Sequence, residues 1–224
     1  MRKVAVIVWV CTVGFLACRR EKPLPKEISE LPEEFRVAVQ KAVETGQIEI
    51  PGDLAGLVSR SGTDEEDSIV LEMPVATYVS STTPLLRWQR QPRLQQYQAH
   101  VLDSAGKVVA ESPITEAGEW KCEPALKPGQ TYRWSVTAKG KRAQVGSPEA
   151  CFAVPAQPVL EQLAGAKQRL GDNGLALAVI YARAGVVDEA ERLLAGAIVR
   201  NPTSEEAKRL YRSLKAQRLQ LKRK

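Results

Sequence analysis

Residues 126–138 read LKPGQTYRWSVTA, and this stretch decides the class of fold. Pro128 and Gly129 favour a turn, and Tyr132, Trp134 and Val136 follow it at a spacing of two. Polar residues stand at the positions between these apolar ones. A period of two is the repeat of a β-strand, so the stretch predicts a strand with one buried face and one face toward water.

The same alternation extends over residues 68–155. Apolar runs follow one another there at intervals of roughly ten residues, separated by turn-forming residues, which is typical of an all-β sandwich. Seven runs give seven predicted strands: SIVLEMPVATYV, TPLLRWQR, LQQYQAHVLD, KVVAES, EWKC, TYRWSVTAKG and QVGSPEACFAV. Most aromatic residues fall within this region, so the packed core is expected here.

Three motifs in this region resemble the fibronectin type III and related immunoglobulin-like sandwiches. They are PLLRW at 84–88, YQAHV at 97–101 and the run from Leu126 to Val136. The resemblance implies that Tyr132 forms a tyrosine corner, in which the hydroxyl bonds to upstream backbone. It also implies that Trp88 and Trp134 belong to the core. A ligand-stacking role is the alternative for these aromatics, and their regular alternation favours the core.

Residues 156–224 are predicted to be helical. The stretch from Gly171 to Ser204 resembles one 34-residue tetratricopeptide repeat. The matching positions are Leu177, Ala178, Tyr181, Gly185, Ala190, Leu194, Ala197 and Pro202. In this resemblance Tyr181 fills the gap between two antiparallel helices and Pro202 closes the repeat. Gly174 and Ala178 depart from the usual Trp and Gly.

A single repeat is too little for an independent solenoid, which needs about three. Helices at 158–169 and 204–220 are therefore expected to supply the missing layers. The alternative is a helical hairpin that has no recognition function. The fold class is thus a β-sandwich followed by a C-terminal helical region.

The N-terminus reads MRKVAVIVWVCTVGFLACRR. Arg2 and Lys3 precede an apolar run from Val4 to Leu16, which is shorter than the roughly 20 residues that span a bilayer. The run ends in FLAC, which resembles a bacterial lipobox with Phe15 in place of the usual Leu. The resemblance implies a signal peptide at 1–17 and lipidation of Cys18. The alternative is an uncleaved N-terminal anchor.

Two short segments separate Cys18 from the sandwich. Residues 18–31 are charged and contain proline, which is typical of a tether. Residues 32–67 are predicted to be a short helix followed by a connector. Pro32 suits the first turn of that helix and Gly46 its end. No structure is predicted for residues 46–67.

Charge and cysteines limit the partners. The net charge is +6. The two basic residues of the signal peptide leave with it, so the excess becomes mild and no nucleic-acid partner is expected. Cys122 and Cys151 are a possible disulfide pair in an exported protein. Strand alternation places Cys122 inward with Trp120, and Cys151 outward beside the inward Phe152, which favours two free thiols.

The sequence lacks the residue patterns of the common catalytic and metal-binding sites. His100, the single histidine, alternates with inward Ala99 and Val101, so it is expected to be exposed and unpaired. A Ser/His or Cys/His arrangement then has no base. The sequence has no CxxC, GxxxxGK[ST], GxGxxG or HExxH, and GTDEEDS at 62–68 lacks the spacing of a calcium loop. We therefore predict no enzyme, cofactor, metal site or small-molecule substrate.

The C-terminal stretch is basic. Its cationic residues include Lys208, Arg209, Arg212, Lys215 and Arg218. On a helix Leu210, Leu214 and Leu221 face inward and most charges face solvent. Contact with anionic lipid or an acidic partner is the alternative.

Together these patterns predict a lipid-anchored protein of a bacterial cell envelope, periplasmic or surface-exposed. Its expected role is a non-enzymatic scaffold that contacts another envelope protein, and a regulatory role is compatible with the same residues. A carbohydrate- or cell-wall-binding role is the alternative. Arg19 follows Cys18 where an Asp would favour the inner membrane, so the outer membrane is preferred.

Overall fold

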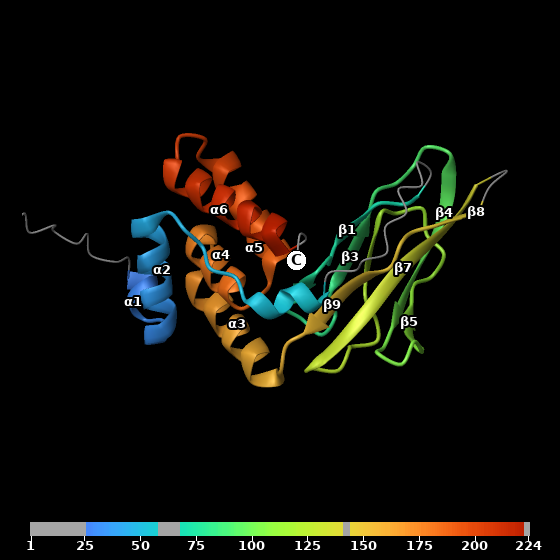
Figure 1. Cartoon of the computed structure of the whole chain (residues 1–224), viewed down its shortest axis with the longest axis horizontal. Coiled ribbons are helices and arrows are strands. Elements are labelled where there is room, and N and C mark those ends of the chain that lie inside the picture. The colour runs from blue at the N-terminus through green and yellow to red at the C-terminus, as the bar shows by residue number, and fades with distance from the viewer. Residues whose placement is uncertain (1–25, 58–67, 141–143, 222–224) are drawn as a thin grey trace, which may run out of the picture.

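The helices and strands occupy opposite ends of the long axis of the molecule (Figure 1). The structure, a computed structural model, describes residues 26–57, 68–140 and 144–221. Helices come from both ends of the chain, and the strands come from the stretch between them. None of the described helices is long and apolar enough to cross a membrane.

The strands form two sheets that share one apolar core. The smaller sheet has the order β1 (Leu71–Met73), β3 (Leu85–Trp88) and β6 (Glu119–Lys121). The larger has the order β2 (Thr77–Tyr78), β9 (Ala150–Val154), β7 (Gln130–Gly140), β4 (Leu94–Leu102) and β5 (Val108–Glu111), and β8 (Gln144–Gly146) also pairs with β7. All of these pairs are antiparallel except β2 with β9. This is the β-sandwich that the alternation predicts.

The central pair of strands shows how the alternation builds the core. Every second residue is buried from Tyr97 to Val101 in β4 and from Tyr132 to Ala138 in β7, because successive side chains of a strand point to opposite faces. Leu86 and Trp88 of the smaller sheet pack into the same core. The inward register pairs of the larger sheet are Tyr97 with Ala138, Ala99 with Val136 and Val101 with Trp134.

The prediction of seven strands needs correction, because the first and last predicted runs each give two strands. The first run changes sheets between Met73 and Thr77, since Pro74 has no N–H for a ladder and Ala76 turns the chain with a φ of 51°. The last run is broken between Gly146 and Ala150. From Gly146 to Ala150 the chain advances by four residues, while the facing part of β7, from Thr137 to Trp134, advances by three. The one extra residue is that of a β-bulge.

Strand β9 is covered on both faces, which separates the two cysteines. Phe152 and Val154 face the sandwich core, whereas Cys151 packs against the helical core. Cys122 is buried within the sandwich, and burial raises the pKa of its thiol to about 12. Both thiols are free and contact different cores. Trp120, expected inward beside Cys122, is only half-buried against the sandwich core.

The C-terminal region forms four helices: α3 (Gln157–Leu170), α4 (Gly174–Arg183), α5 (Val187–Arg200) and α6 (Glu205–Leu221). Gly171 ends α3, and the Asn173 side chain caps α4 by accepting the N–H of Ala176 at 3.2 Å. Helix α4 is buried along almost its whole length and packs against α3 and α5. Tyr181 on α4 is 2% exposed.

The N-terminal segment packs into the helical half and completes it. The sequence did not indicate this packing. It contains α1 (Lys26–Ser29), α2 (Glu33–Thr45) and the short 3₁₀ helix η1 (Gly52–Leu57). Helix α2 packs on α4 and α6, and its buried residues belong to the same core as theirs. Residues 32–57 are therefore not a separate connector. The sandwich is inserted between two parts of one helical unit.

The Tyr132 hydroxyl makes the backbone contacts that the resemblance implies. It accepts the N–H of Lys127 at 2.9 Å and lies 3.3 Å from the Lys127 carbonyl, five residues upstream. The ring is buried and stacks on Phe152 with centroids 5.7 Å apart. The hydroxyl thus holds the turn before β7 while the ring fills the core.

Two substitutions test this core. Tyr132→Phe removes the acceptor of the Lys127 N–H and should lower the free energy of unfolding by about 1 kcal/mol or more. Trp134→Ala leaves a cavity at a side chain with no exposed surface and should cost about 3–5 kcal/mol. Urea unfolding measures both, with Ser135→Ala on the outer face as the control. A loss below 1 kcal/mol for Trp134→Ala would show that its side chain is not in the core.

Candidate functional site at the junction of the two halves

The chain between β1 and β2 is the part of the sandwich that meets the helices. Thr77 is fully buried there, and its hydroxyl oxygen accepts the N–H of Val187 at 2.8 Å. The same hydroxyl lies 3.1 Å from the Gly185 carbonyl, to which it can donate. Val186, at the N-cap position of α5, has no side-chain acceptor, so Thr77 supplies the cap from a distant part of the chain.

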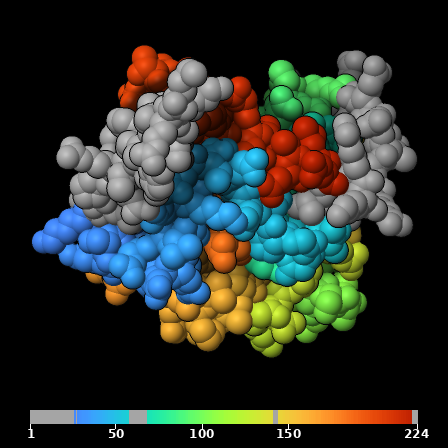
Figure 2. Space-filling view, turned by 60° about the vertical axis from the view of Figure 1, so that its left-hand side comes forward, coloured from blue at the N-terminus to red at the C-terminus, as the bar shows by residue number. Residues whose placement is uncertain are grey.

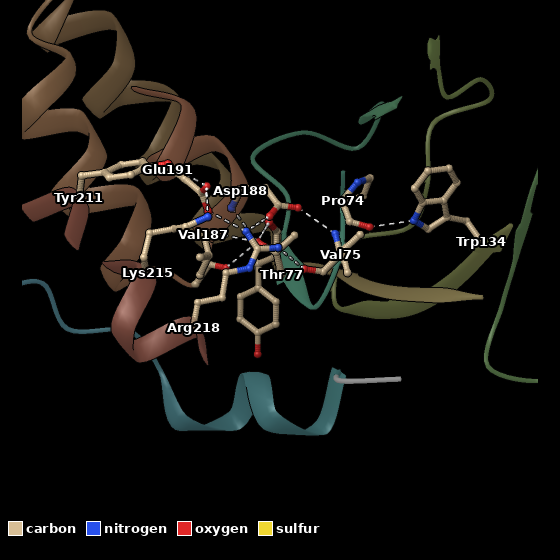
Figure 3. Close-up of polar contacts among 12 residues, drawn as sticks. Pro74, Val75, Thr77, Trp134, Val187, Asp188, Glu191, Tyr211, Lys215 and Arg218 are labelled. Atoms are coloured by element: carbon tan, nitrogen blue, oxygen red, sulfur yellow. Dashed lines mark hydrogen bonds and ion pairs between the residues drawn. The ribbon is translucent and has the colours of Figure 1, made fainter. Parts of the chain in front are cut away.

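A buried ion pair lies beside this cap (Figure 3). Asp188 of α5 and Arg218 of α6 approach to 2.6 Å between Oδ1 and Nη1, with side chains 6% and 18% exposed. Both also bind Val75: the Asp188 carboxylate accepts its N–H at 2.8 Å, and Arg218 Nη2 donates to its carbonyl at 3.0 Å. One residue of the sandwich connector is therefore held at both backbone groups.

The charges around Arg218 extend the pair into a network. Arg218 Nη1 lies 3.0 Å from Glu191, and Lys215 Nζ lies 2.9 Å from the same carboxylate. Burial raises the pKa of Asp188, while Arg218 and the Val75 N–H act in the opposite direction. Burial also opposes ionisation of Glu191, but its bonds to Lys215 and Arg218 lower the pKa of Glu191 overall. Two cations thus balance two carboxylates in this network.

The sandwich core is connected to the same point. Trp134 Nε1 donates to the Pro74 carbonyl at 2.8 Å, one residue before Val75 (Figure 3). A continuous series of contacts therefore runs from the centre of the sandwich through Pro74 and Val75 to α5 and α6. Burial of these groups strengthens each bond, because few water molecules compete for the donors and acceptors.

Tyr78 secures the other side of the junction. Its N–H donates to the Gly185 carbonyl at 2.9 Å, and its hydroxyl donates to Asp53 of η1 at 2.7 Å. Burial and the bond to Asp53 raise the pKa of Tyr78 to about 12. Gly185 has a φ of 81°, and a Cβ there would lie 2.8 Å from the Tyr78 ring. Only glycine fits this turn between α4 and α5 without displacing the ring.

A cleft of about 150 Å³ opens beside the ion pair. Its sandwich wall includes Met73 and Leu85, and its helical wall includes Glu189 and Arg192. Glu189 accepts the hydroxyl of Ser80 at 2.8 Å and the Ser80 N–H at 3.2 Å. The cleft is polar on the helical side, where the hydrogen-bonded Ser80 and Glu189 both line it.

The residues singled out from the sequence fall in separate places. Trp88 and Tyr132 are sandwich core, and only Trp134 also reaches the junction. Tyr181 is in the helical core, where burial raises its pKa to about 12, and it bonds to Ser80. Pro202 is exposed in the turn between α5 and α6. Cys18 lies outside the described residues.

The alternation predicted that His100 would be unpaired, and this prediction is wrong. Its Nδ1 lies 3.2 Å from Glu111 on the neighbouring strand, and its Nε2 lies 3.3 Å from the Thr137 hydroxyl. The cross-strand register brings these three side chains together on the outer face of the larger sheet. The alternation correctly placed His100 outside the core, but it carried no information about which residues lie on the adjacent strands.

Arg218 is an exception to the prediction that most charges of α6 face solvent, because its side chain is only 18% exposed, whereas Lys215 is exposed as predicted. Both pair with carboxylates of α5. Leu210 and Leu214 are fully buried, as predicted, and the Leu221 side chain is outside the described part of the chain. Sequence reasoning missed Thr77, Val75 and Asp188, because a helix cap or a backbone contact formed across more than a hundred residues has no local pattern. Among the described residues no cluster of three or more His, Cys, Asp or Glu is suited to a metal.

Neither a protein-family model nor a curated protein matches this chain. Among solved structures, a Fn3-like protein from Clostridium thermocellum is similar at 17% identity and a TM-score of 0.31, covering 40% of this chain and 96% of that one. CopC from Methylosinus trichosporium OB3b is similar at 19% identity and a TM-score of 0.30, covering 40% and 95%. The sandwich is established by its own strand pairing.

The ion pair is tested by removing one partner. Arg218→Met leaves Asp188 buried without its closest counter-charge and should lower the free energy of unfolding by about 3–5 kcal/mol. Arg212→Met, at an exposed position of the same helix, should change it by less than about 0.5 kcal/mol. Urea unfolding of the two variants measures the difference.

Adding Asp188→Val to Arg218→Met removes the unpaired carboxylate and should recover part of the loss. A loss for Arg218→Met no larger than that of Arg212→Met would contradict the role given to this pair.

Proposed function

We propose that this protein is a lipid-anchored scaffold of a bacterial cell envelope, attached through Cys18 and binding an envelope protein. The observation that supports this proposal is the junction, in which Val75 is held by Asp188 and Arg218. A buried contact of this kind keeps the sandwich and the helices in one orientation. A fixed orientation is what a scaffold needs in order to present a surface, whereas fold alone establishes no function.

The helical half supports protein binding through its outer faces. We propose that α4 and α5 are a tetratricopeptide-like hairpin, on the pattern that includes Tyr181 and Pro202. Helix α4 is covered by α2, α3 and α5, so the exposed surface of this half lies on the other helices, α2, α3, α5 and α6. Val199 on α5 is 79% exposed. Exposed aliphatic side chains of this kind suit contact with another protein.

The proposal is non-enzymatic. His100 is within bonding range of both Glu111 and Thr137 on the outer face of the larger sheet. None of the three lines the cleft beside Lys41, the cleft beside Ser80 or the cleft beside Gln91. A catalytic group needs a site in which a substrate is held against it. His100 forms cross-strand contacts, but none of these clefts holds a substrate against it.

Carbohydrate binding is less well supported than protein binding. Sugar sites on sandwiches use exposed aromatic platforms, and every described aromatic side chain of this protein is buried or half-buried. Trp88 and Trp134 are 2% and 0% exposed. Trp120 is half-buried against the sandwich core. No observation in the described residues favours a sugar platform, so we retain one function.

The anchor is tested by Cys18→Ser. In a bacterial host that lipidates exported proteins, the wild type should partition into the detergent phase, and Cys18→Ser should remain an uncleaved precursor or enter the aqueous phase. Two or more acyl chains are needed for stable anchoring. Cys11→Ser is the matched control, since it alters a cysteine inside the proposed signal peptide and should leave partitioning unchanged. Membrane retention of mature Cys18→Ser, verified unlipidated by mass spectrometry, would disprove the anchor.

Protein binding is tested separately from the anchor. A photo-crosslinking residue at Val199 or Ile114, both exposed, should give a discrete protein adduct in intact cells. The same residue at buried Leu194 is the control for background crosslinking. Sedimentation with purified peptidoglycan should leave the protein in solution. Co-sedimentation together with the absence of any protein adduct would favour the cell-wall role instead.

A further inference from the structure

The N-terminal segment is fixed to the helical half, because the backbone of residues 46–51 is hydrogen-bonded to α6. Residues 46–51, which we call the strap, run without helix or strand structure between α2 and η1. The Ile48 N–H donates to the Ser213 hydroxyl at 3.0 Å, and the Ile50 N–H donates to Gln217 Oε1 at 3.2 Å. Gln217 Nε2 donates in turn to the Ile48 carbonyl. One glutamine thus satisfies two backbone groups of the strap, much as a neighbouring strand would.

Apolar burial and close packing also hold the strap. Ile48 is 1% exposed within the helical core. Gly46 ends α2 with a φ of 70°, and the Arg209 side chain lies over it, 3.3 Å from where a Cβ would stand. Removing the strap from α6 would therefore expose apolar surface and leave backbone groups without partners.

The strap continues into η1, which reaches the sandwich. Leu54 is fully buried in the helical core, and Asp53 accepts the Tyr78 hydroxyl. Helix η1 also packs against β2, β9 and α6. Figure 2 shows this part of the chain in cyan, between the blue N-terminal helices and the green and yellow sandwich. Residues 26–57 are consequently attached to both halves of the molecule.

We propose that residues 26–57 orient the anchored protein, with the α1–α2 end next to the membrane surface and the loop end of the sandwich pointing away from it. The inference rests on the proposed lipidation of Cys18. Seven residues lie between Cys18 and Lys26, where α1 begins, and the eight steps along an extended chain from Cys18 to Lys26 span at most about 28 Å. Figure 1 places α1 and α2 at one end of the long axis, and the tips of β4 and β8 at the other.

Tether length, and not charge, brings the helical end to the membrane in this arrangement. The exposed residues of α1 and α2 include Lys26 and Lys41, but also Glu33, Glu34 and Glu44. A surface of mixed sign gains little from anionic lipid. The most basic stretch of the chain, on α6, uses Lys215 and Arg218 in contacts with α5. The occupant of the α1–α2 end is therefore a lipid surface of any headgroup charge.

The surface turned away from the membrane is the loop end of the sandwich. It carries a cleft of about 280 Å³ lined by Arg90, Gln91, Pro92, Leu94, Gln95 and Glu116. Ile114, two residues before Glu116, is 62% exposed. A polar cleft next to an exposed aliphatic side chain is the composition expected at the rim of a protein–protein contact. A protein partner that binds this end must lie on the side of the molecule opposite the membrane.

Energy transfer to the membrane tests the orientation. The full chain is expressed with Val37→Cys on α2 or Gln144→Cys on β8, purified in lipidated form, labelled with a donor and placed in phosphatidylcholine vesicles that contain an acceptor lipid. Labelling of the chain without an added cysteine corrects for Cys122 and Cys151. We expect transfer from position 37 to be several-fold more efficient than from position 144. The ratio should not change when a fifth of the lipid is replaced by phosphatidylglycerol.

The outcomes separate this inference from the anchor. Failure of the lipid-competent wild type to bind vesicles would overturn the anchor and the orientation together. Binding with equal transfer from both positions, or with more from position 144, would overturn the orientation alone. A ratio that rises with phosphatidylglycerol would overturn the part of the inference that excludes charge.

The strap is tested in the same assay. Gln217→Ala removes its bidentate contact and should bring the two transfer efficiencies closer together, whereas Gln220→Ala, exposed on the same helix, should not. Circular dichroism establishes that each variant is folded. Equal ratios in folded Gln217→Ala and Gln220→Ala would overturn the role of the strap.

Discussion

The arrangement of this protein depends on the two bonds that hold the backbone of Val75. Its N–H and carbonyl would otherwise be polar groups enclosed between two apolar cores, and each would lack a partner. Asp188 satisfies one and Arg218 the other, and the two side chains neutralise each other at 2.6 Å. Because α5 supplies the acid and α6 the base, the position of the connector is tied to the packing of both helices.

A buried ion pair is seldom the most stable solution, since removing two charges from water costs about as much as their attraction returns. Its value is geometric. An apolar contact between Val75 and the helices could slide, whereas a carboxylate bonded to the N–H and a guanidinium bonded to the carbonyl of the same residue allow a single alignment. Thr77 adds a second directional constraint, because its hydroxyl serves as the cap of α5. We therefore regard the junction as a device for orientation more than for stability.

Both ends of the chain contribute to this orientation. The N-terminal segment passes between α4 and α6, binds α6 through Gln217 and reaches Tyr78 through Asp53. The C-terminal helix returns to the sandwich through Arg218. The inserted sandwich is thus held from two directions, and a protein anchored at Cys18 would present it in one pose.

The sequence by itself determined what depends on neighbours along the chain. The period of two around Tyr132 and Trp134 identified the sandwich and its inner face, and Gly171 marked the end of a helix at the correct place. Such features follow from backbone geometry and local burial, which act over a few residues. The bounds of α3 and α6 were predicted to within a few residues for the same reason.

Tertiary structure alone decided which distant segments meet. Nothing near Val75 indicates Asp188, 113 residues away, and nothing near Arg218 distinguishes it from the solvent-exposed cations of the same helix. The amphipathic face of α2 showed that the helix is packed, but not that α4 and α6 are its partners. A buried polar group requires some partner of opposite character, and only the complete arrangement of the chain determines which residue supplies it.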